Sequence, residues 1–164
     1  MNDTITGETV FSVVPDKQEV TMSRIFDAPR ELVFDAYIDP EQIVHWWGPR
    51  NLDTIVDKLD PRPGGQWRFV NRTAGTVDEH GFHGFYHEVL RPERLVYTFE
   101  YEGVPGHVLM ETVRFDEIDG KTRATSTAVY QSVADRDGMV AAGMESGARQ
   151  SMDRLAELLA KAQS

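Results

Sequence analysis

The chain has 164 residues, of which 40% are hydrophobic and 27% charged, a composition typical of a soluble globular protein with a substantial buried core. Its 27 acidic and 17 basic residues give a formal net charge of −10, which opposes binding to nucleic acid or to an anionic membrane surface. The absence of cysteine excludes disulfides and thiol chemistry and is compatible with a reducing cytosol.

We expect a loose N-terminal tail over residues 1–8 and a single domain over residues 9–164. The sequence contains no run of about 18 apolar residues, so no membrane span is predicted. The first residues contain neither a basic segment nor an apolar stretch of the kind found in secretion signals. A cytoplasmic location is therefore expected.

The first part of this domain predicts two strands followed by two short helices. Residues Thr9–Val14 and Glu19–Phe26 are rich in β-forming side chains, and Pro15 between them is typical of a turn. Pro29 suits the first position of a helix. Pro40 ends that helix and can begin a second one, which leads into the sequence HWWGPR.

From Leu52 onward the apolar pattern has a period of two residues, which predicts about five successive antiparallel strands. Turns are indicated by Pro63-Gly64-Gly65, by residues 91–93 and 103–106, and by Asp119-Gly120. One face of the predicted sheet is rich in aromatic and aliphatic side chains. We expect this face to carry Trp67, Phe69, His83, Phe85, His87, Val89, Leu95, Tyr97, Phe99, Tyr101, His107, Leu109, Glu111, Val113 and Phe115.

The last segment, Val133–Ala160, predicts one long amphipathic helix. Gly143 and Gly147 lie four residues apart and would leave a notch on one helical face beside Met139 and Met144, which we interpret as room for a ligand. Glycine weakens a helix by about 1 kcal/mol relative to alanine, so these glycines are unusual there. The apolar stripe of the helix consists of Val140, Met144, Ala148, Met152, Leu155 and Leu159.

A curved antiparallel sheet must cover its apolar face with another element. The C-terminal helix is the only predicted element long enough to do so. We therefore predict an α+β fold in which the sheet wraps around the C-terminal helix and the two short helices close one end.

Several short motifs are spread over nearly the whole chain, from about Val20 to Leu159. They read RIFDAP at 24–29, DP at 39–40, WWGP at 46–49, PGGQW at 63–67, HGFYHEV at 83–89, PERLV at 92–96, ET at 111–112 and QSVADRDGMVAAG at 131–143. Together with the order of elements, they resemble the START-like helix-grip fold, also called the SRPBCC superfamily. Within it the chain is similar to the Activator-of-Hsp90-ATPase homologue branch, which some schemes group with polyketide cyclases.

This resemblance implies a cavity between the sheet and the long helix that accepts apolar small molecules. No catalytic residue set is shared across the branch, so the resemblance assigns none to this chain. Eukaryotic members that stimulate the Hsp90 ATPase have a second, N-terminal domain, for which this chain has no room. The resemblance therefore argues against an Hsp90-type chaperone as the partner.

The expected function is binding of an apolar or aromatic small molecule inside that cavity, although the same aromatic residues would also fill a closed core. Trp46 and Trp47 are adjacent and cannot point the same way, so one ring should pack in the core while the other borders the cavity mouth. The pattern does not decide which ring does which. We assign to the site Trp46, Trp67, Phe69, His83, Phe85, Tyr97, Phe99, Tyr101, His107, Leu109, Met139, Gly143 and Met144.

Two rival functions fit the sequence. An enzyme of the cyclase or hydrolase kind would use His107 and Glu111 as acid–base groups, because histidine titrates near neutral pH. A chaperone-associated interaction module would use its surface instead of its cavity. No cofactor is expected, because the sequence lacks nucleotide-binding motifs. No metal is expected either, because His83 and His87 would lie about 13 Å apart along a strand.

Overall fold

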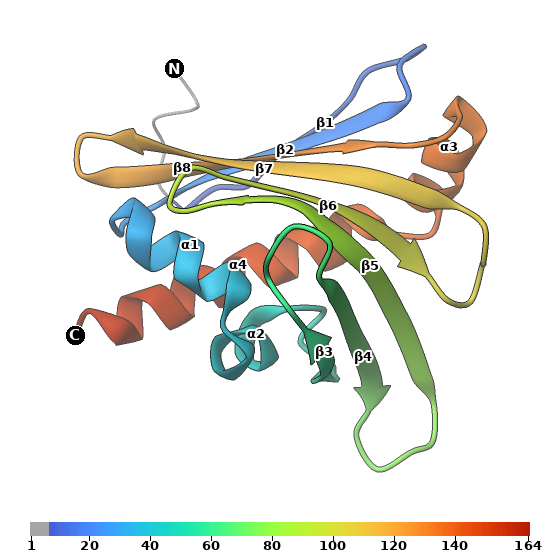
Figure 1. Ribbon diagram of the computed structural model, residues 1–164, viewed down its shortest axis with the longest axis horizontal. Coiled ribbons are helices and arrows are strands. Elements are labelled where there is room, and N and C mark those ends of the chain that lie inside the picture. Colours follow the sequence, from blue (N-terminus) through green and yellow to red (C-terminus); the bar gives the residue numbers. More distant parts are fainter. Residues whose placement is uncertain (1–6) are drawn as a thin grey trace.

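The computed structural model describes residues 7–164 and contains one eight-stranded antiparallel sheet that curves around a long helix (Figure 1). The predicted α+β helix-grip fold is confirmed. Residues 1–6 of the expected tail lie outside the described residues. The strands follow the order β1-β2-β8-β7-β6-β5-β4-β3 across the sheet. They comprise β1 (Val10–Val13), β2 (Glu19–Phe26), β3 (Leu52–Leu59), β4 (Gln66–Thr73), β5 (Glu79–Leu90), β6 (Arg94–Tyr101), β7 (Val108–Ile118) and β8 (Lys121–Val129).

Two short helices, α1 (Arg30–Ile38) and α2 (Pro40–Trp46), close one end of the sheet. Pro29 precedes the first turn of α1 in an extended conformation, one position earlier than predicted. Pro40 begins α2, and the Asp39 carboxylate accepts a hydrogen bond of 2.9 Å from the backbone N–H of Glu41. α2 therefore begins at the proline predicted to start it, whereas α1 begins one residue after Pro29.

The C-terminal segment is two helices, α3 (Val133–Ala141) and α4 (Met144–Ala162), and the prediction of one continuous helix was wrong. Gly143 has a φ of +89°, a left-handed conformation that interrupts the helical path. Figure 1 shows α4 running beneath the sheet and α3 at its far end. Met152, Leu155 and Leu159 of α4 are buried. None of the helices in residues 7–164 has the length and apolar character needed to cross a membrane.

In the part of β5 that precedes residue 87, each side chain points to the face opposite to the one predicted. A β-bulge between Tyr86 and Glu88 shifts the register against β6. Val89 packs against the core as expected, but before the bulge Phe82 and Tyr86 face inward while Phe85 is 47% exposed. Because side chains alternate strictly along a regular strand, one extra residue exchanges the two faces.

The two glycines of the predicted notch should respond oppositely to alanine. At both Gly143 and Gly147, an added Cβ would meet no other group within 4 Å, so backbone conformation decides the result. Gly147 lies inside α4, and Gly147→Ala is expected to raise the free energy of unfolding by up to about 1 kcal/mol. Gly143→Ala is expected to lower it by about 1–2 kcal/mol because of the positive φ. Urea denaturation of both variants measures this, and equal shifts would contradict the break at Gly143.

Candidate functional site

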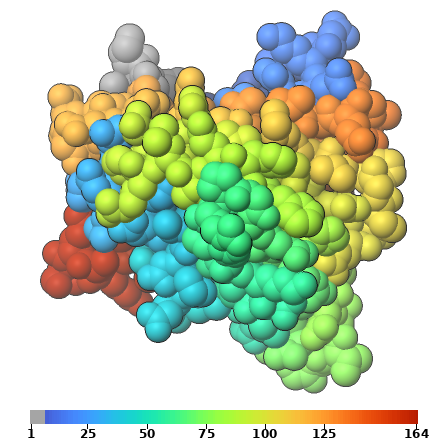
Figure 2. Space-filling model, viewed as in Figure 1, coloured from blue at the N-terminus to red at the C-terminus, as the bar shows by residue number. Residues whose placement is uncertain are grey.

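A cavity of about 450 Å³ lies between the concave face of the sheet and the helices. This volume falls within the range of about 300–1,000 Å³ that small-molecule sites occupy. Figure 2 shows that most of α4 is covered from this side, with only its C-terminal part (red) visible at the lower left. The aromatic residues that line the cavity are Phe11, Tyr37, Trp46, Trp47, Trp67, Phe69, Phe82, Tyr86, Tyr97, Phe99 and Tyr130.

Both adjacent tryptophans reach the cavity, in different ways. Trp46 is only 4% exposed, and its indole N–H donates to the backbone carbonyl of Ala36 at 3.0 Å. Trp47 is half-buried and packs edge-on against Phe69 and Phe82, with ring centroids 5.1 and 5.3 Å apart. Trp46 therefore anchors the end of α2 in the core, while Trp47 belongs to the aromatic wall.

The segment after the tryptophans is bound to α4. The backbone N–H of Gly48 donates to the Ser151 hydroxyl at 2.9 Å. Gly48 has a φ of +92°, and a Cβ on it would lie 2.9 Å from the amide oxygen of Asn71. This close approach and the positive φ both require glycine. A hydrogen bond thus connects the segment that carries Trp47 to α4, the helix that covers the cavity.

Trp67 forms the central part of the wall on the sheet. It pairs with Gly84 of β5, and a Cβ on Gly84 would lie 2.8 Å from the indole nitrogen. The indole N–H donates to the carbonyl of Thr98 at 3.1 Å. The glycine therefore lets a tryptophan ring lie flat across β5 and reach β6.

Glu111 is a partly buried carboxyl group, and its side chain lines the cavity. It lies opposite Tyr97 in the β6–β7 register, and the Ser126 hydroxyl donates to its Oε2 at 2.5 Å. Burial raises the pKa of Glu111, and hydrogen bonds from Ser126 and Tyr97 oppose this effect. Neither partner carries a positive charge, so this carboxyl combines a low-dielectric environment with neutral hydrogen-bond partners.

Three tyrosines surround the same region. The Tyr37 hydroxyl lies 4.0 Å from the sulfur of Met152, and the Tyr130 hydroxyl lies 3.3 Å from the sulfur of Met144. Burial, together with the negative charge of Glu111, raises the pKa of Tyr37, Tyr97 and Tyr130. These hydroxyls are therefore neutral hydrogen-bonding groups at physiological pH.

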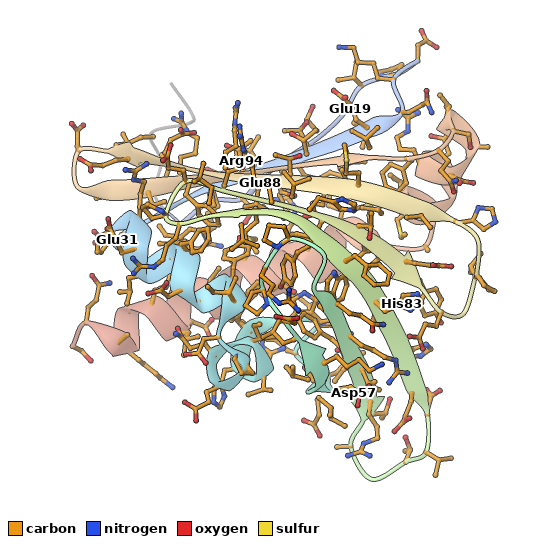
Figure 3. All side chains as sticks on the ribbon, in the orientation of Figure 1. Glu19, Glu31, Asp57, His83, Glu88 and Arg94 are labelled. Carbon is orange, nitrogen blue, oxygen red and sulfur yellow. The ribbon has the colours of Figure 1, made fainter. Side chains whose placement is uncertain are left out.

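His83 and Phe85 lie on the outer face of the sheet, so their placement in the cavity was wrong. The two ring nitrogens of His83, which is labelled on β5 in Figure 3, contact the carboxylates of Glu102 at 2.8 Å and Glu100 at 3.3 Å. Arg68 binds the same Glu102 carboxylate and lowers its pKa to about 2. His83 thus belongs to a surface charge network, and the bulge in β5 explains why alternation placed it inside.

His107 and Glu111 are also separated, which corrects the proposed acid–base pair. His107 precedes the first residue of β7, and its side chain is 56% exposed. Its Nδ1 lies 2.9 Å from Oδ1 of Asp135 in α3. Side-chain alternation does not extend beyond the end of a strand, and this is why the pattern misplaced His107.

The other predicted residues have clear positions. Tyr101 lies beside the cavity without lining it: its hydroxyl is 2.7 Å from Nδ1 of His80, and its ring packs on Phe82. Cavity-lining residues that the prediction assigned are Trp46, Trp67, Phe69, Tyr97, Phe99, Leu109, Met139, Gly143 and Met144. Residues that it missed include Tyr37, Trp47, Phe82, Tyr86, Ser126, Tyr130 and Ser151.

The sequence held a signal for part of the missed set. Phe82, Gly84 and Tyr86 alternate as consistently as the neighbouring histidine series, and glycine opposite Trp67 indicates the face on which a large ring lies. Tyr37 and Ser151 come from helices, whose placement over the sheet no strand pattern specifies. Within residues 7–164, no three histidine, aspartate or glutamate side chains are grouped so as to hold a metal ion.

Comparison with known proteins gives one family and several similar structures. Residues 27–160 match the family described as Activator of Hsp90 ATPase homolog 1-like protein. The crystal structure of protein Ms6760 from Mycobacterium smegmatis is 24% identical, with a TM-score of 0.83 over 92% of this chain and 95% of that chain. A protein from Arthrobacter aurescens is 21% identical, with a TM-score of 0.85 over 93% and 91%.

A third similar structure, the AHSA1 protein SPO3351 from Silicibacter pomeroyi, is 22% identical, with a TM-score of 0.72 over 87% of this chain and 97% of that chain. No curated protein matches this chain in sequence. At these identities the structural matches support the fold alone.

Proposed function

The chain belongs to the Activator of Hsp90 ATPase homolog 1-like family, and from the cavity within its fold we infer that it binds an apolar or aromatic small molecule. The observation that carries this proposal is the cavity of about 450 Å³ lined by aromatic rings. Protein interiors are normally close-packed, with few voids larger than a water molecule. A large space with apolar walls is therefore best explained as a place for a ligand.

The arrangement of the cavity suits a binding protein. Its walls come from the strands and from the helices, while a few polar groups, including Glu111 and Ser126, line it. Apolar surface supplies affinity in such sites, and a few polar groups set orientation. The proposal does not include acid–base catalysis by His107 and Glu111, because His107 bonds to Asp135 away from the cavity lining.

Titration with the neutral fluorescent probe N-phenyl-1-naphthylamine tests this function. We expect saturable binding to the parent protein and at least roughly tenfold weaker binding to Gly147→Leu, since burying several added carbons in the cavity displaces the probe. Gly147 lines the cavity, and an added Cβ there meets nothing within 4 Å, so the variant should fold.

Gly138→Leu is the matched control. Gly138 also lies in a helix with open space around its Cβ, but it is exposed and does not line the cavity. We expect this variant to bind the probe as the parent does. Equal affinity of all three proteins, or no saturable binding at all, would contradict the proposed function.

A further inference from the structure

The Glu111 carboxyl has a central place in the cavity. It lies on β7, and its strand neighbours in register are Tyr97 on β6 and Ala128 on β8. The aromatic wall and α4 enclose the same space. A ligand that fills the cavity would therefore come within contact distance of this carboxyl.

The groups that face Glu111 are neutral. They are Tyr97 from β6, Ser126 from β8, Tyr37 from α1 and Tyr130 from the segment after β8. None of them can neutralise an ionised carboxylate, although Ser126 and Tyr97 donate hydrogen bonds to it.

Two arginines of β2 and β8 are directed elsewhere. Arg24 lies on the concave face, but its Nη1 is 2.5 Å from Oδ1 of Asp153. Arg123 alternates along β8 with the buried Thr122 and Ala124, so it lies on the opposite face of the sheet from Ser126. The protein therefore does not direct these cations toward Glu111.

Such a carboxyl is costly for the fold. Burying an ionised carboxylate without a cation is unfavourable, and two hydroxyl partners compensate only in part. A glutamine or a leucine would satisfy a purely structural role at less cost. Titratable groups that line cavities are common at functional sites, so the position of Glu111 favours a role toward a ligand.

The surroundings favour a positively charged ligand. Aromatic rings attract cations through their negative faces, and this cavity contains Trp47, Trp67 and Tyr97 on its walls. The formal net charge of −10 also draws cations toward the protein and repels anions. The carboxyl group, the aromatic rings and the net charge of the protein all favour a ligand with a positive charge.

We propose that the ligand is an amine, whose apolar or aromatic body contacts the aromatic walls while its protonated nitrogen donates hydrogen bonds to the carboxylate of Glu111. This inference rests on the proposed function, because it identifies the ligand class of the same cavity. A hydrogen-bonded ion pair in this apolar space would give the carboxylate a charge partner, which residues 7–164 do not supply.

Three probes with one ring system separate charge from shape: 9-(aminomethyl)anthracene, 9-anthracenemethanol and anthracene-9-carboxylate. For the parent protein we expect the amine to bind at least about tenfold more tightly than the alcohol, and the carboxylate to bind most weakly. In Glu111→Gln the amine should lose at least about tenfold in affinity, while the alcohol should change by less than about threefold. Fluorescence titration measures all six affinities.

Glu117→Gln is the control, because it removes the same charge from an exposed position of the same strand. It should retain the preference for the amine. Equal binding of amine and alcohol to the parent, or an unchanged amine preference in Glu111→Gln, would overturn this inference and leave the proposed function intact. Failure of all three probes to bind would overturn this inference, and it would overturn the proposed function as well if N-phenyl-1-naphthylamine also fails to bind.

Discussion

Replacement of Leu155 with aspartate is expected to lower the free energy of unfolding by at least about 4 kcal/mol, since it removes core contacts and buries an unpaired charge. Leu155 is 0% exposed and belongs to the same apolar cluster as Phe34 of α1 and Ile43 of α2. The free energy of unfolding of native proteins is only about 5–15 kcal/mol, so this variant should retain only a small part of the stability of the parent. Urea denaturation followed by tryptophan fluorescence measures the loss.

Ala160→Asp provides the control for this result, because it introduces the same side chain at an exposed position of α4. Its expected cost is less than about 1 kcal/mol, which an acidic side chain near the C-terminal end of a helix can produce. If the two variants lost similar stability, the Leu155 side chain would not be buried on the inner face of α4.

Glu111→Gln is expected to make the protein more stable at about pH 8, by roughly 1–3 kcal/mol, because it removes a partly buried carboxylate that has no cationic partner within residues 7–164. Burial raises the pKa of Glu111 in the folded state above its ordinary value of 4.5. As the pH rises above 4.5, the unfolded chain releases this proton before the folded protein does. The folded state therefore loses stability up to its raised pKa, and glutamine abolishes that loss.

The comparison should accordingly depend on pH. At about pH 4 the carboxyl is protonated in the folded protein, so the parent and Glu111→Gln should have nearly the same stability. Glu117→Gln, at an exposed site, should leave the stability within about 0.5 kcal/mol of the parent at both pH values. A destabilised Glu111→Gln variant at about pH 8 would show that the carboxyl supports the fold.

A residue that lowers stability where function needs it is a familiar feature of binding sites. The stability of Glu111→Gln and its amine affinity are therefore complementary measurements. A gain of stability together with a loss of amine binding is the combination that the proposed ligand class requires.

The elements and their approximate positions were determined by local features of the sequence. Pro40 begins α2 as predicted, the predicted strand Glu19–Phe26 coincides with β2, and the stripe containing Met152 and Leu155 is the buried face of α4. Apolar residues recur every two residues in a strand and every three to four residues in a helix, and this period indicates which side of the element is buried. A long helix was then required to cover the concave face, and the fold class followed.

Tertiary structure decided the details of the site. The bulge at Tyr86–Glu88 exchanged His83 and Phe85 for Phe82 and Tyr86, because the strand had to remain in register with β6 on both sides of it. His107 lies outside β7, where alternation no longer applies.

The proposed cavity group was likewise brought together from distant parts of the chain. Glu111 meets Ser126 and Tyr97 because β7 lies between β6 and β8, and Tyr37 approaches from α1. Sequence alone indicated which side most elements bury, since burial is a local pattern, and β5 before its bulge is the exception. Which buried groups meet depends on strand register and on how the helices pack over the sheet, and only the folded chain specifies both.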